Sequence, residues 1–118
     1  MTLTLGDVSL VLTGDAEAEV WSQISTQIPE NTVFFKLPHH GSSDAMFSAG
    51  GETPWLDEVP RSAQLGISSH VRPFSHPDPR VVALLNDLGA SYYRTDHHYH
   101  ITVETDRTGP ASVKYSHV

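Results

Sequence analysis

The chain is organised around one stretch, Thr32-Val33-Phe34-Phe35-Lys36-Leu37-Pro38-His39-His40-Gly41-Ser42-Ser43. Its first four residues are apolar or β-branched and predict a short buried strand. Pro38 cannot continue strand pairing, and Gly41 with the two serines predicts a tight turn that leads into a helix N-cap. Two adjacent histidines, His39 and His40, therefore stand where a strand ends. Neighbouring side chains on an extended chain point to opposite sides, so both face one site only if the turn bends them together; otherwise one packs and the other meets solvent.

Composition describes a folded chain and limits its partners. The chain has 118 residues, of which 38% are hydrophobic and 18% charged, and this fits a single domain spanning residues 1–118. The formal net charge of −7 argues against a surface that grips nucleic acid by itself. The absence of cysteine excludes disulfides and thiolate metal sites. No apolar run approaches the length of a membrane span, and the first residues show no signal-peptide pattern.

Strand and helix patterns alternate along the chain. Apolar alternation predicts a β-hairpin over residues 2–13, and apolar side chains at four-residue spacing predict a helix over residues 16–28. Residues 49–61 show no period and are expected to form a loop with one turn near Trp55-Leu56. The other expected elements are strands at 33–37, 63–68 and 90–95, helices at 43–47 and after Asp78, and an antiparallel pair at 101–105 and 112–115. This order predicts an α/β fold with an at least partly parallel sheet and crossover helices.

Polar side chains follow three of the predicted strands. Asp15 follows the hairpin, His39-His40 follows the next strand, and a His- and Pro-rich loop from His70 to His76 follows the third. Ligands bind at the carboxyl ends of strands in such sheets, so we expect these groups to converge on one edge. A carboxylate with imidazoles suits zinc, manganese or iron. Asp15, His40 and one further histidine are nevertheless too few to fill the shells of two metal ions.

Each candidate also has a structural interpretation without chemistry. Asp15 could cap a helix that begins at Ala16. His76 could belong to a helix entry, and Lys36 could be a solvated strand end. The group His97-His98-Tyr99-His100 is expected to be an exposed turn that binds metal only adventitiously.

Four motifs occur in an order known from one protein family: Leu12-Thr13-Gly14-Asp15, Phe35–Ser42, Ser75-His76-Pro77 and Tyr93-Arg94-Thr95-Asp96. The chain resembles the C-terminal half of metallo-β-lactamase-fold hydrolases, most closely the domain at the end of ComEC-type DNA-uptake (competence) proteins. The resemblance covers nearly the whole chain. It implies half of an αββα sandwich, with a mixed sheet and crossover helices on one face.

The resemblance also implies roles for five residues. Asp15 matches a bridging metal ligand, and His40, or else His39, matches the last ligand of the fold. The other histidine of the pair and His76 would then face the substrate, a phosphate ester, with Lys36 beside them. The complete fold holds two metal ions, zinc or manganese. The family's main metal motif, His-x-His-x-Asp-His, is absent from this chain, and the Asp that the DNA-uptake domains carry three residues before the lysine is replaced by a valine.

Two functions follow as expectations. The first is a metal-dependent hydrolase with phosphodiesterase- or nuclease-type chemistry, completed by an N-terminal half that carries the missing motif. The alternative is a truncated or degenerate domain without catalysis that serves in assembly. A complete metal site formed between chains is a further hypothesis for the hydrolase. A half sandwich leaves one sheet face bare, and large exposed apolar faces usually pair. We therefore expect either a homo-oligomer or a covering N-terminal segment, and an isolated chain that is inactive.

Overall fold

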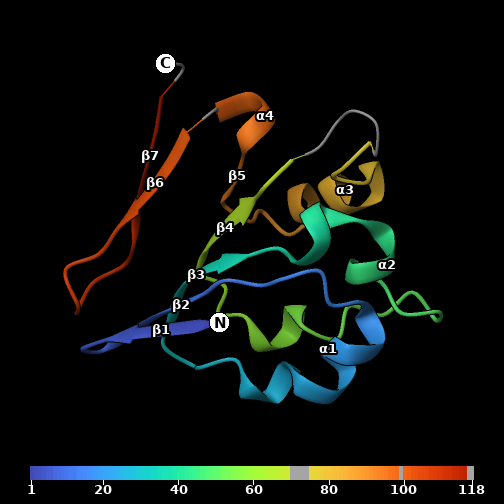
Figure 1. Cartoon of the computed structure of the whole chain (residues 1–118), viewed down its shortest axis with the longest axis horizontal. Helices are drawn as coiled ribbons and strands as arrows, with labels where there is room; N and C mark the ends of the chain where they lie inside the picture. The colour runs from blue at the N-terminus through green and yellow to red at the C-terminus, as the bar shows by residue number, and fades with distance from the viewer. Residues whose placement is uncertain (70–74, 99, 117–118) are drawn as a thin grey trace.

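Five strands form one mixed sheet in the spatial order β1-β2-β3-β4-β5 (Figure 1). The structure is a computed structural model that describes residues 1–69, 75–98 and 100–116. The strands span Thr2–Leu5 (β1), Val8–Val11 (β2), Thr32–Lys36 (β3), Gln64–Ile67 (β4) and Tyr92–Arg94 (β5). β1 pairs antiparallel with β2, whereas the four strands β2, β3, β4 and β5 are parallel to one another. The predicted α/β class with a mixed sheet is confirmed.

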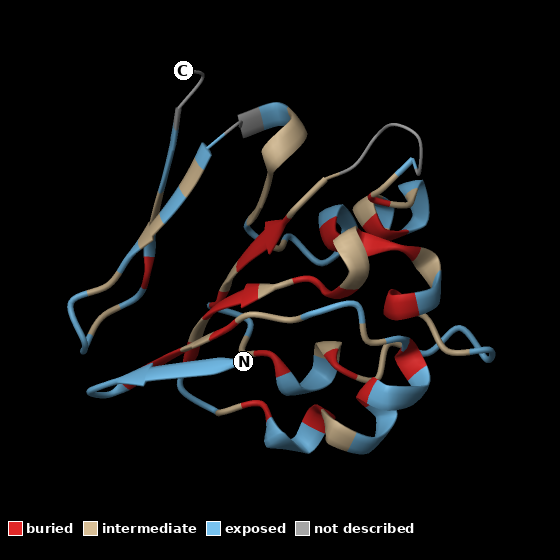
Figure 2. Cartoon of the chain, viewed as in Figure 1, coloured by how far each residue is buried: buried red, intermediate tan, exposed pale blue. Residues whose placement is uncertain are grey.

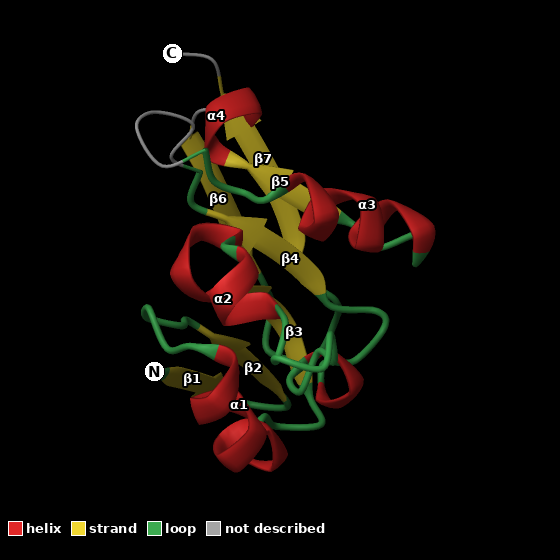
Figure 3. Cartoon of the chain, turned by 90° about the vertical axis from the view of Figure 1, so that its right-hand side faces the viewer, coloured by secondary structure: helices red, strands yellow, loops and turns green. Residues whose placement is uncertain are grey.

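The helices that connect the parallel strands cover one face of this sheet. Figure 3 shows them in front of the strands when the molecule is turned by 90°. Right-handed crossovers between strands that are neighbours in both sequence and space place every connection on the same side. The helical segments are α1 (Ala18–Ile24), η1 (Ser25–Gln27), η2 (Pro38–Gly41), α2 (Ser43–Met46), η3 (Leu56–Glu58) and α3 (Pro79–Asp87).

The core lies between this helical layer and the sheet (Figure 2). The Phe35 ring of β3 is fully buried, with its centroid 5.8 Å from the Trp21 ring and 5.2 Å from the stacked Trp55 ring. Trp55 belongs to the segment 49–61, which the sequence predicts to be a loop and which contains the short turn η3. Aromatic side chains dominate the energetics of cores of this size. This irregular segment is therefore part of the packed core.

The last two strands form a separate antiparallel ribbon. β6 (His100–Glu104) pairs with β7 (Ser112–Ser116), as the sequence predicts, and within the described residues the pair forms its own two-stranded sheet. Figure 1 shows the ribbon on the side of the five-stranded sheet away from α2 and α3. It partly covers the face that the helices leave open. Over the described part of the chain, no helix has the length and apolar character needed to cross a bilayer.

Two predicted elements change their limits. The first helix begins at Ala18, two residues later than expected, with Glu17 at the N-cap position. The region of His97, expected to be an exposed turn, instead includes a four-residue helix, α4 (Thr95–His98), directly before β6. So short a helix cannot display a 3.6-residue period in the sequence. His70, from the predicted His- and Pro-rich loop, lies outside the described residues.

Candidate functional site

His39, His40 and Gly41 adopt consecutive left-handed backbone conformations after β3. Their φ angles are 44°, 58° and 74°. Residues with a Cβ rarely adopt this region, and a run of them turns the chain sharply. The turn brings the two imidazole ring centroids to 6.1 Å from each other. Of the two arrangements that the sequence leaves open, the bent turn is the one found.

His76 completes a cluster of three imidazoles. Its ring centroid is 5.8 Å from that of His39 and 6.3 Å from that of His40, and the His40 and His76 rings are nearly parallel, at 7°. Gly41 permits this approach, because a Cβ at that position would stand 2.9 Å from the Cβ of Pro77. The Gly41 carbonyl also accepts a 3.0 Å hydrogen bond from the backbone N–H of Asp78. The segment before α3 is therefore fastened directly to the histidine turn.

His40 is held in a defined orientation toward Asp15. Its Nδ1 lies 2.7 Å from the carbonyl oxygen of Ser68, and because a carbonyl can only accept, Nδ1 carries the proton. In the neutral ring Nε2 then carries the lone pair, and this atom lies 3.9 Å from Asp15 Oδ1. Two ligands bound to one zinc ion in tetrahedral geometry stand about 3.3 Å apart. A small movement would therefore let both bind one ion, and a carbonyl partner on the second nitrogen is usual for metal-binding histidines.

Asp15 does not cap the following helix. The helix begins at Ala18, and its N-cap Glu17 makes no side-chain capping bond. The Asp15 side chain is 69% exposed, whereas that of His40 is 26% exposed. The alternative interpretation, in which Asp15 caps a helix starting at Ala16, is wrong. The carboxylate instead lies 3.9 Å from the His40 imidazole and is largely exposed.

No family model, curated protein or solved structure matches this chain. The resemblance to metallo-β-lactamase-fold hydrolases therefore rests on the sequence motifs and stays a prediction. Within the described residues, no three or more His, Cys, Asp or Glu side chains are grouped so that they could hold a metal ion. The Asp15–His40 pair fits two positions in one coordination shell and does not complete that shell.

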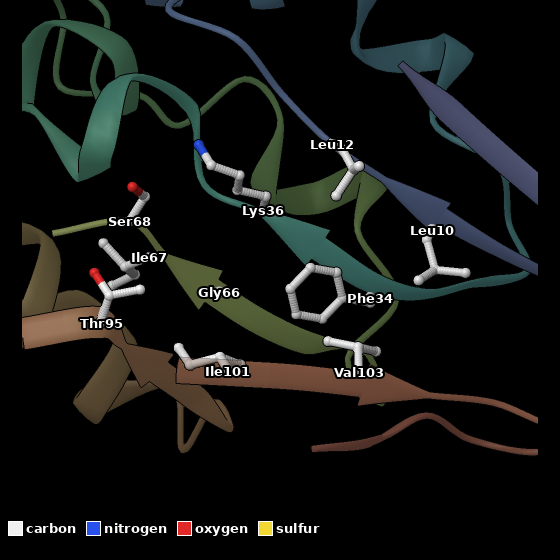
Figure 4. A pocket seen from close by; sticks show the side chains of 10 residues that line it. All are labelled: Leu10, Leu12, Phe34, Lys36, Gly66, Ile67, Ser68, Thr95, Ile101 and Val103. Carbon is white, nitrogen blue, oxygen red and sulfur yellow. The ribbon is translucent and has the colours of Figure 1, made fainter. Parts of the chain in front are cut away.

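Lys36 lies at the end of β3, between this site and the open face of the sheet. Its Nζ donates a 3.3 Å hydrogen bond to the carbonyl of Leu37, and its own carbonyl accepts a 2.8 Å bond from Thr13 Oγ1. Burial lowers the pKa of the Lys36 ammonium, and the negative charge of Asp15 partly offsets that shift. The side chain lines a groove on the face away from the helices (Figure 4).

Two features of the site are not visible in the sequence. The Nδ1 atom of His39 is buried and has no hydrogen-bond partner among the described residues. Four other buried side-chain atoms of the described residues share this property, among them the Nε1 atoms of Trp21 and Trp55. Ser68 fixes the tautomer of His40 through its backbone carbonyl. Every residue has such a carbonyl, so no sequence signal could have found it.

Proposed function

We propose that this chain supplies one half of a metal-dependent hydrolase site that acts on phosphate esters, with phosphodiesterase- or nuclease-type chemistry. The observation that carries the proposal is the His40 imidazole, fixed by the Ser68 carbonyl, with Nε2 3.9 Å from the Asp15 carboxylate. An oriented imidazole beside a carboxylate, at the carboxyl ends of parallel strands, is a donor set that suits zinc or manganese.

The five predicted site residues divide into two groups in this proposal. Asp15 and His40 would hold one metal ion, and His39, His76 and Lys36 would face the phosphate. Metal ions in a binuclear site supply Lewis-acid stabilisation of the phosphoryl oxygen and a water of lowered pKa. The Lys36 ammonium and the two imidazoles would orient the ester by hydrogen bonds to its non-bridging oxygens. The remaining ligands would come from a second segment carrying His-x-His-x-Asp-His.

Calorimetric titration with zinc and with manganese tests the ligand pair. We expect saturable binding at one site, and we expect Asp15→Ala and His40→Ala each to abolish it. His100→Ala is the matched control, because it removes an exposed imidazole from the group that could collect metal adventitiously. Binding that survives both site variants, or that only His100→Ala removes, would contradict the assignment.

Turnover is tested separately with bis(4-nitrophenyl) phosphate. The chain alone lacks most of the ligands, so we expect its hydrolysis rate with zinc or manganese to equal that of the metal in buffer. A faster rate that Asp15→Ala abolishes would show that the chain needs no second segment.

Assembly without catalysis is a second candidate function. All four residues of the edge strand β1 are exposed, including Leu3 at 47% and Leu5 at 44%. The strand has neither proline nor charge, so it is not protected against pairing with another chain. We expect a homo-oligomer in size-exclusion chromatography with light scattering, and a monomer for Leu3→Lys. A parent chain that stays monomeric at every concentration would exclude this candidate.

A further inference from the structure

A groove of about 260 Å³ lies on the face of the sheet that the helices leave uncovered. Leu10 and Phe34 form the wall on the side of the sheet, and Ile101 and Val103 of β6 form the facing wall (Figure 4). Gly66 allows the Phe34 ring to lie close against β4, because a Cβ at that position would stand 2.6 Å from the ring. The ribbon and the sheet together therefore build an apolar slot.

Three polar side chains gather at one end of this groove. Figure 4 shows Lys36 at the end of β3, Ser68 just after β4 and Thr95 at the start of α4, with the apolar walls extending away from them. Lys36 is the only charged residue among the described residues that line the groove. The Thr95 Oγ1 atom accepts a 2.9 Å hydrogen bond from the backbone N–H of Ser69, so the hydroxyl can donate its own hydrogen elsewhere.

We propose that this groove binds a medium-chain fatty acid, with the carboxylate at Lys36 and the aliphatic chain between Phe34 and β6. A single cation at one end of an otherwise apolar slot complements a molecule with one anionic group and a long apolar body. The ammonium has three donors, and its hydrogen bond to the Leu37 carbonyl uses one of them. A lone cation also suits a singly charged carboxylate better than a doubly charged phosphate.

The negative charge of the Asp15 carboxylate attracts the Lys36 ammonium. This carboxylate competes with a bound fatty acid for the same ammonium. Removing that charge with Asp15→Asn should therefore strengthen fatty-acid binding, although the same position is a ligand in the proposed hydrolase. The inference goes beyond that proposed function and requires no metal ion. It concerns the chain without a covering segment, because a second half of the sandwich packed on this face would fill the groove.

A second copy of the chain is a less suitable occupant of the groove. Each copy carries a formal charge of −7, and this repulsion opposes the face-to-face burial of two apolar slots. A small monoanion brings far less charge and meets the one cation of the groove directly.

Calorimetric titration of the 118-residue chain with octanoate, octanol and octylammonium tests the charge requirement at constant chain length. We expect octanoate to bind at one site, about tenfold more tightly than octanol, because it gains a charge-assisted hydrogen bond. Octylammonium should bind more weakly than octanol. Lengthening the carboxylate should tighten binding by about threefold to fourfold per methylene until the groove is full.

Matched variants locate the ligand. Lys36→Met keeps the apolar stem and should weaken octanoate binding about tenfold while leaving octanol unchanged. Lys114→Met is its control, since that ammonium is exposed on the ribbon beside Glu104. Val103→Glu should abolish binding by placing a carboxylate in the slot, and Thr102→Glu, on the exposed face of the same strand, should not.

Three results would overturn the proposal. The first is the absence of octanoate binding up to its solubility limit, and the second is equal binding of octanoate and octanol. The third is octanoate binding that Val103→Glu leaves intact in a folded variant, as judged by circular dichroism. Light scattering adds a fourth such result: a dimer that Val103→Glu converts to a monomer would assign the groove to a second copy instead.

Discussion

Phe34 and Phe35 are neighbours on β3 and show how differently the two faces of the sheet are built. Phe35 is fully buried beneath the helices, between the rings of Trp21 and Trp55. Phe34 is 7% exposed and lies against Gly66, beside a groove of about 260 Å³. The two side chains are almost equally buried, yet one is enclosed by packed atoms and the other borders an open slot. Burial alone therefore does not reveal whether a face of a sheet is closed.

The largest expected difference between the two faces is the loss of stability when each phenylalanine is replaced by alanine. Phe35→Ala should lower the free energy of unfolding by about 3–5 kcal/mol, because it leaves a cavity inside a closed core. Phe34→Ala should cost about 1–2 kcal/mol less, because the lost volume joins a groove that already exists. Urea unfolding followed by far-ultraviolet circular dichroism measures both changes. Equal losses would mean that the open face is packed as tightly as the core.

Gly66→Ala tests whether the Phe34 ring depends on the missing Cβ. The new methyl would stand 2.6 Å from the ring, and such overpacking typically costs about 1–3 kcal/mol. Gly14→Ala is the control, because a Cβ there has nothing within 4 Å. Combining Gly66→Ala with Phe34→Ala should cost less than the sum of the two single changes, since removal of the ring removes the clash. Additive losses would place the strain in the backbone.

The β6–β7 ribbon forms one wall of the groove, and its anchoring should depend on the Arg94–Asp96 ion pair at the start of α4. Arg94 at the end of β5 donates two hydrogen bonds to Asp96, of 3.0 and 2.7 Å, and both side chains are less than one-fifth exposed. Asp96→Asn should lower the free energy of unfolding by about 1–2 kcal/mol. It should also loosen the ribbon that follows α4, measured as faster amide exchange in β6 than in β3. Equal rates in both strands would show that the pair does not anchor the ribbon.

The same pair predicts a dependence of stability on pH. Burial opposes ionisation of Asp96, but its hydrogen bonds outweigh that effect and lower the pKa of the carboxyl group in the folded chain. An unfolded aspartate titrates at about 3.9. The stabilisation is therefore complete above about pH 4 and is lost as the pH falls through the lower native value. Urea unfolding of the parent and of Asp96→Asn should converge in that acidic range, and a constant difference would contradict the prediction.

The α/β class and the order of the strands and helices could be predicted from the sequence, because burial leaves a period in these elements. The parallel strands and α3 follow their apolar patterns, and Asp78 caps α3 as expected. Trp55 could not be placed, because it reaches the core from a segment without a period. The docking of the ribbon could not be predicted either, because hairpin pairing is local whereas the contact of Ile101 and Val103 with the groove is tertiary.

The candidate site was predictable in its residue types and not in its geometry. The strand ends indicate that Asp15 and His40 should approach one another, and they lie 3.9 Å apart. The left-handed turn at His39 and His40 has no signature, because histidine seldom adopts that conformation without tertiary support. The hydrogen bond from His40 Nδ1 to the Ser68 carbonyl is likewise a property of the folded backbone.

A comparison of Asp15 with Asp78 has the smallest expected effect, and it discriminates well because both aspartates precede a helix. The Asp78 carboxylate accepts a 2.8 Å hydrogen bond from the backbone N–H of Arg80 and caps α3, whereas Asp15 is 69% exposed and caps nothing. Asp78→Ala should therefore cost about 1 kcal/mol of unfolding free energy. Asp15→Ala should change it by less than about 0.5 kcal/mol, because an exposed pair with His40 at 3.9 Å contributes little. Equal losses in urea unfolding would give Asp15 a structural role and remove the reason to regard it as a ligand. If Asp15→Ala instead leaves the free energy of unfolding almost unchanged and abolishes zinc binding, the carboxylate at this position serves metal binding and not stability.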